Sequence, residues 1–110
     1  MYDESLAARI RPLLGAEPFT ERKMFGGVAF LRKGLMFAGV TGDALMARVG
    51  KENHADSLGR KHVRPMDFTG KPMQGYVFVD PGGTKTAAQL RFWLERCERF
   101  VATLPFKPGK

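Results

Sequence analysis

The spacing of apolar residues near the carboxyl end of the chain predicts a long amphipathic helix. The repeat of three and four residues that places side chains on one helical face is followed by Leu90, Trp93, Leu94, Cys97, Val101 and Leu104. Thr86 and Gln89 have the spacing of a capping box, in which the two side chains accept hydrogen bonds from each other's backbone N–H groups. We therefore expect a helix from about Thr86 to Leu104, ended by Pro105.

A second helical pattern opens the chain. Leu6, Ile10, Leu13 and Leu14 share one helical face. Asp3 or Ser5 is the expected amino-terminal cap, and Gly15 is the expected stop. Pro12 cannot donate a backbone hydrogen bond and its ring disturbs the preceding turn, so the helix should kink or end near Arg11.

Between these helices the pattern changes to that of short strands. We predict strands over residues 20–25, 27–33, 35–40 and 44–49, a short helix or turn within 50–61, a short strand at 63–68 and a clear strand at 76–79. The links between the first four strands are short and contain glycine, so these strands should be antiparallel neighbours. Alternation within 44–49 places Arg48 on the side opposite Leu45 and Val49.

This order of elements predicts an α+β fold. We expect a two-layer sandwich in which one antiparallel sheet carries helices on one face, with the long helix last. The length of 110 residues fits a single domain over residues 1–110.

Composition adds a basic charge balance. The formal net charge is +7, and residues 32–71 carry eight basic and four acidic side chains. A basic balance favours polyanionic or acidic partners. Because no recognition-helix pattern accompanies it, any nucleic-acid binding should be weak, sensitive to salt and indifferent to sequence. The single cysteine and the lack of an apolar run of membrane length lead us to expect a cytoplasmic protein.

No catalytic constellation can be recognised in the sequence. The two glycines of Met24–Gly27 precede a strand, whereas a phosphate-binding loop precedes a helix. His54 and His62 lack the spacing of metal ligands, so we expect no metal and no organic cofactor. Cys97 lies on the apolar face of the last helix, where we expect a buried thiol with a raised pKa rather than a nucleophile.

The strongest candidates for binding are cationic. They are Arg48, Arg60, Lys61, His62, Arg64 and Lys71. One interpretation is a concave site for an anion or a partner, with Arg48 projecting from the neighbouring strand. The other is a solvated loop in which Asp67 pairs with Arg48 or Arg64. Phe92 lies off the apolar stripe of the last helix and is the best aromatic candidate for a partner surface.

Three motifs together resemble one family. They are R-K-M-F-G-G at 22–27, G-L-M-F-A-G-V at 34–40 and R-P-M-D-F-T-G-K-P-M-Q-G-Y-V at 64–77. This pattern is similar to the amino-terminal domain of TfoX/Sxy proteins, and in particular to its short single-domain members. The resemblance implies a two-layer α+β fold. Full-length members help to switch on natural-competence genes together with the cyclic-AMP receptor protein, and this chain stops where their carboxy-terminal domain would begin. No set of catalytic residues comes with the family.

These observations predict a non-catalytic regulatory or adaptor module that acts through a protein partner, as a monomer or homodimer. Two alternatives stay open. One is a small protein or enzyme that binds an anion or nucleotide with the basic loop 60–71 and Arg48. The other is a weak, non-specific nucleic-acid binder.

Overall fold

The computed structural model describes residues 3–14, 18–24, 26–66 and 74–104. In this part of the chain six strands form one antiparallel sheet in the order β1-β2-β3-β4-β6-β5. The strands are β1 (Thr20–Met24), β2 (Gly27–Arg32), β3 (Leu35–Thr41), β4 (Ala44–Arg48), β5 (Val63–Pro65) and β6 (Tyr76–Val79). The α-helices are α1 (Glu4–Ile10), α2 (His54–Leu58) and α3 (Ala87–Val101), with 3₁₀ turns at Arg11–Leu14 and Pro81–Gly83. The predicted α+β fold is confirmed.

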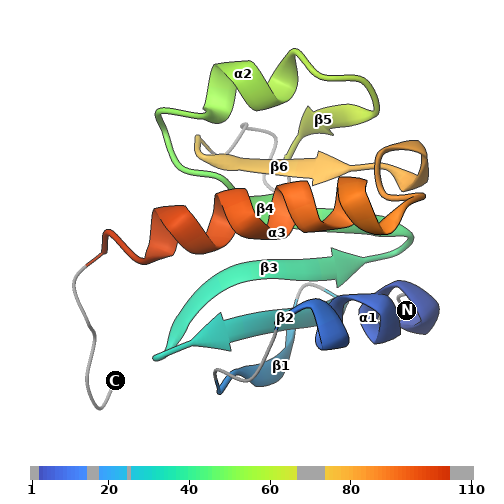
Figure 1. The fold of residues 1–110 in the computed structure, drawn as a ribbon, viewed down its shortest axis with the longest axis vertical. Coiled ribbons are helices and arrows are strands. Elements are labelled where there is room, and N and C mark those ends of the chain that lie inside the picture. Colours follow the sequence, from blue (N-terminus) through green and yellow to red (C-terminus); the bar gives the residue numbers. More distant parts are fainter. Residues whose placement is uncertain (1–2, 15–17, 25, 67–73, 105–110) are drawn as a thin grey trace.

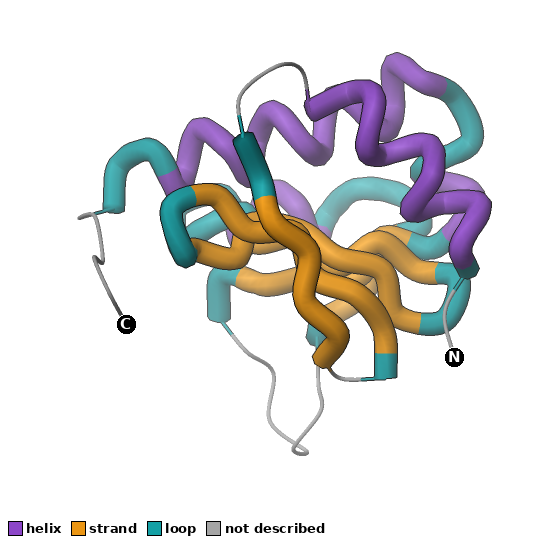
Figure 2. Tube along the Cα trace, turned by 90° about the horizontal axis from the view of Figure 1, so that it is seen from below, coloured by secondary structure: helices purple, strands orange, loops and turns teal. Residues whose placement is uncertain are grey.

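The helices cover one face of the sheet (Figure 1 and Figure 2). α3 lies over β3 and β4, and α1 lies beside β3. The main core between the layers contains apolar side chains of α1, α3 and the central strands, among them Ile10, Phe30, Phe37, Leu45, Val79, Leu90 and Leu94. Trp93, with 4% of its surface exposed, belongs to this core, as its position on the predicted stripe requires. In the described residues no helix combines the length and the apolar character needed to cross a membrane.

The first helix begins and ends as its sequence predicts. The Asp3 carboxylate caps α1 by accepting from the backbone N–H of Ser5 at 2.9 Å. α1 ends at Ile10, and the chain continues through the 3₁₀ turn that contains Pro12. The expected stop at Gly15 lies outside the described residues.

The capping box of the last helix is confirmed, but its predicted end was wrong. Gln89 N–H donates to the Thr86 hydroxyl and Thr86 N–H donates to the Gln89 amide oxygen, both at 3.0 Å. α3 ends at Val101 rather than Leu104. The backbone N–H and the side-chain hydroxyl of Thr103 both donate to the carbonyl oxygen of Phe100, the hydroxyl at 2.6 Å. The chain therefore forms tight turns before Pro105.

A second apolar cluster occupies the opposite face of the sheet. It contains Ala29, Leu31, Ala44, Met46, Met66 and Phe78, with Met36 and Tyr76 at its border. The alternation predicted for β4 is confirmed, because Leu45 and Val49 pack in the main core while Met46 packs here. The short helix α2 and the strand β5 are also present, and the predicted continuation of β5 past Met66 lies outside the described residues.

Candidate binding cleft

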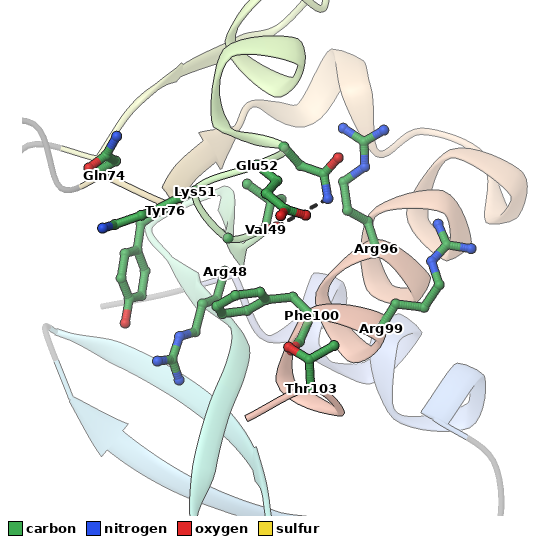
Figure 3. Close-up of a pocket in the computed structure, with 13 residues that line it drawn as sticks. Arg48, Val49, Lys51, Glu52, Gln74, Tyr76, Arg96, Arg99, Phe100 and Thr103 are labelled. Atoms are coloured by element: carbon green, nitrogen blue, oxygen red, sulfur yellow. Dashed lines mark hydrogen bonds between the residues drawn. The ribbon is translucent and has the colours of Figure 1, made fainter. Parts of the chain in front are cut away.

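A cleft of about 700 Å³ opens where β4 ends, beside the start of β6 and the last turns of α3 (Figure 3). Its walls come from three segments that are distant in the sequence. They are residues 48–53, residues 74–76, and Arg96, Arg99, Phe100 and Thr103 of α3 and the turn after it. We call this site the cleft.

Backbone hydrogen bonds fix the floor of the cleft. The N–H groups of Val49 and Gly50 both donate to the carbonyl of Gly75, at 2.8 and 3.0 Å. The Gly75 N–H donates in turn to Nδ1 of His54 at 2.9 Å, which gives this histidine a structural position in the loop. Gly50 has φ of +87°, and a Cβ atom there would overlap the ring of Phe100. A glycine is therefore needed both for the backbone conformation and for the close approach of Phe100.

Arg48 is held between two aromatic rings. The central carbon of its guanidinium lies 5.6 Å from the ring centroid of Tyr76 and 5.4 Å from that of Phe100. Its Nη1 donates to the carbonyl of Met36 at 3.1 Å. Cation–π contacts of this kind hold the charge in place without neutralising it. Arg48 therefore brings a positioned positive charge to the cleft.

Further charges line the rim. Lys51 and Arg99 are exposed, and neither side chain forms a hydrogen bond or an ion pair with any residue in the described ranges. Arg96 differs, because its Nη1 donates to the Asp56 carboxylate at 2.8 Å and to the Ser57 hydroxyl at 3.0 Å. Among the described residues, Glu52 is the single acidic side chain of the lining. The cleft thus presents the charges of Arg48, Lys51 and Arg99 against one carboxylate.

Three other predicted candidates border a separate, smaller hollow. Arg60, Lys61 and His62 lie there against α3, next to Phe92. Arg60 pairs with Asp56 at 3.2 Å, and its guanidinium lies 4.5 Å from the centroid of Phe92. Lys61 and His62 are exposed.

At this hollow Phe92 packs against other side chains of the same chain. The guanidinium of Arg96 lies 4.7 Å from the Phe92 centroid, and the Trp93 ring meets Phe92 edge-on at 5.1 Å. Hydrogen bonds from Arg96 and Arg60 to Asp56 lower the pKa of its carboxyl below the usual value. Phe92 is therefore half-buried in a structural cluster that joins α2 to α3.

The remaining candidates lie elsewhere. Arg64 pairs with Asp80 at 3.0 Å and lies over the ring of Phe78, which belongs to the second apolar cluster. Lys71, and the Asp67 expected to pair with Arg48 or Arg64, lie outside the described residues. The structure thus places Arg48, the Arg60–His62 run and Arg64 in three separate places rather than around one concavity.

Sequence reasoning missed Lys51, Arg99 and the two rings that flank Arg48. Each residue is unremarkable in its own segment, and they come together through the pairing of β4 with β6 and the position of α3 above them. Knowledge that β4 pairs with β6 in this register would have placed Arg48 opposite Tyr76. The predicted burial of Cys97 is confirmed, and burial raises the pKa of its thiol to about 12.

The described residues contain no group of three or more His, Cys, Asp or Glu side chains suited to hold a metal ion. They define an α+β domain whose single antiparallel sheet is covered by helices on one face, with a basic cleft at one end of the sheet. The family model of the TfoX N-terminal domain matches residues 12–101, and the chain belongs to this family. Comparisons with curated proteins and with solved structures gave no significant match.

Proposed function

We propose that this domain is a non-catalytic regulatory or adaptor module that acts by binding a protein partner, in the context of transcription or competence regulation. The observation that carries the proposal is the match to the TfoX N-terminal domain over residues 12–101. The family is consistent with a regulatory role, and the part that this chain plays in such a role is our proposal.

The cleft supports a binding role by its composition. Arginine and aromatic side chains are enriched at the energetically important positions of protein interfaces. Arg48, Tyr76 and Phe100 form such a group, and the exposed Lys51 and Arg99 lie beside it. A partner that bound here would meet a floor held by backbone hydrogen bonds.

A second candidate function is the binding of a small anion or nucleotide. The observation that favours it is the guanidinium of Arg48, which is held by two rings. One of its nitrogens donates to the carbonyl of Met36, and its other N–H groups have no acceptor in the described ranges, so they can donate to an anion. Inorganic phosphate and a mononucleotide, each titrated by isothermal calorimetry, distinguish this function from protein binding.

The experiment that tests the adaptor proposal is chemical cross-linking of the tagged domain in its source cells, followed by mass spectrometry. Each captured protein is then purified and its affinity for the isolated domain is measured. We expect one partner to bind the purified domain directly. Failure of every captured protein to bind it, or turnover in a broad enzymatic screen that one point substitution abolishes, would contradict the proposal.

A further inference from the structure

We propose that the cleft binds an acidic, extended segment of the partner protein, with separate carboxylates meeting Arg48, Lys51 and Arg99. This inference rests on the adaptor function proposed above and specifies the chemistry of the surface that the partner presents. Three observations support it: the cleft is basic, its cations point in different directions, and Arg48 covers ring faces of Tyr76 and Phe100.

The charge of the cleft calls for an anionic ligand. Lys51 and Arg99 make no ion pair among the described residues, and Arg48 donates to a carbonyl rather than a carboxylate. Arg96, which also lines the cleft, differs because it shares Asp56 with Arg60. Three cations that form no ion pair among the described residues, against the one carboxylate of Glu52, favour a partner of opposite charge.

The arrangement of the cations distinguishes a chain of carboxylates from one compact anion. The head groups of Arg48, Lys51 and Arg99 point in different directions and do not converge on one point (Figure 3). A single phosphate would need its donors to converge. Successive acidic side chains along an extended peptide point in alternating directions, so they suit cations that diverge.

Two features favour a peptide over a nucleic acid. Stacking of bases needs free ring faces, but Arg48 already covers the faces of Tyr76 and Phe100 that border it, and Phe100 also packs against Gly50. Glu52 on the rim would repel a phosphate backbone that follows the cleft. A peptide tolerates this carboxylate because it can place a neutral or basic side chain beside it.

The test uses the whole chain and a fluorescein-labelled peptide of alternating Glu and Ala, with binding followed by fluorescence anisotropy at low salt. The same peptide with Gln in place of Glu, and a single-stranded oligonucleotide of equal charge, are the comparison ligands. The cleft variant carries Lys51→Glu and Arg99→Glu. The control variant carries Lys23→Glu and Arg91→Glu, both at exposed positions outside the cleft. Each pair of substitutions removes two positive charges and adds two negative ones, which changes the net charge from +7 to +3.

We expect the cleft variant to bind the Glu peptide about tenfold or more weakly than the unmodified protein, and the control variant to bind within about twofold of it. The Gln peptide should show no measurable binding. Equal losses in the two variants would overturn the inference, because binding would then follow net charge alone. Tighter binding of the oligonucleotide, weakened in the cleft variant, would also overturn it in favour of a nucleic-acid site.

Two further measurements keep this test separate from folding and from the proposed function. If the charge-reversed cleft variant does not fold by circular dichroism, Lys51→Gln with Arg99→Gln takes its place, and Lys23→Gln with Arg91→Gln is its control. A cross-linked partner that binds both charge-reversed variants as tightly as the unmodified protein would overturn the inference while leaving the adaptor function standing. A partner that loses affinity only for the cleft variant supports both.

Discussion

Two arginines on neighbouring parts of the sheet differ in what surrounds their charge. Arg32, at the end of β2, is 8% exposed. It donates to the carbonyl of Leu14 at 2.6 Å and pairs with the Glu98 carboxylate of α3 at 3.0 Å. Arg48, at the end of β4, lies between two rings and meets no carboxylate among the described residues. The charge of Arg32 is therefore paired with a carboxylate of the protein itself, whereas the charge of Arg48 is held in place by the two rings without such a pair.

In a basic domain, structural cations can be distinguished from candidate binding cations by the groups that surround them. The two side chains are of the same type and carry the same formal charge. What differs is whether acceptors of the protein itself satisfy the guanidinium, since a charge removed from water must be paired. We therefore assign Arg32 to the stability of the fold and propose binding for the cleft.

The largest expected effect is on stability at Arg32. Arg32→Met keeps much of the packing but removes the ion pair and leaves the Leu14 carbonyl without its donor. We expect a loss of about 2–4 kcal/mol in the free energy of unfolding, somewhat less than the roughly 3–5 kcal/mol for a fully buried pair, because Glu98 is 29% exposed. Urea unfolding measures it, with Arg91→Met as the exposed control at under about 0.5 kcal/mol. Equal costs for the two variants would contradict the structural role of Arg32.

Gly50→Ala is the next largest change and acts on the cleft. The positive φ costs about 1–2 kcal/mol for an alanine, and the new Cβ must also displace the Phe100 ring. Gly42 has φ of +58° with no atom within 4 Å of a built Cβ, so Gly42→Ala is a matched control for the backbone term alone. We expect Gly50→Ala to be the more destabilising and to weaken binding of the acidic peptide. Similar unfolding energies would show that Phe100 can move away freely.

Thr86→Ala tests whether a loss of stability alone weakens binding. The substitution removes the hydroxyl that caps α3, at the end of the helix far from the cleft, and should cost about 1 kcal/mol. Peptide affinity should be unchanged, and Thr86→Ser should restore the stability. A loss of affinity in the alanine variant would mean that the cleft responds to the stability of the whole helix.

The smallest effect is a pH dependence at Asp56, whose pKa is lowered by hydrogen bonds from Arg96 and Arg60. A carboxyl whose pKa is lower in the folded than in the unfolded state stabilises the fold when the pH is above its unfolded-state pKa. This contribution is lost as the pH falls through its folded-state pKa. The melting temperature of the unmodified protein should exceed that of Asp56→Asn near neutral pH, and the difference should shrink as the pH falls below about 3.8. The exposed turn residue Asp43, replaced by Asn, is the control. A difference that stays constant with pH would contradict the assignment.

Local patterns were sufficient to predict most of the fold. The stripe from Leu90 to Val101, the Thr86 cap and the glycine-bearing turns between strands act over a few residues, so the sequence displays them directly. The end of α3 was missed because the hydroxyl of Thr103 competes for a carbonyl of the last turn, and a stripe of apolar positions carries no signal for that competition.

The candidate site was less predictable, because a site depends on which segments meet. Arg48 was singled out correctly as a residue that turns away from the main core. The cations of residues 60–64 were grouped with it because they are close in sequence and share its charge. The strand β6 lies between β4 and β5 and separates Arg64 from Arg48, whereas Arg99 reaches the cleft from the last helix.

The most direct test of the central claim is a two-dimensional ¹H–¹⁵N NMR titration of the unmodified protein with the Glu–Ala peptide. We predict that the amide signals of Val49, Gly50, Lys51 and Tyr76 shift as the peptide binds, while those of Arg32, Leu35 and Phe37 stay in place. Shifts centred on Arg32, or spread evenly over all exposed basic residues, would contradict the claim that the cleft is the binding site.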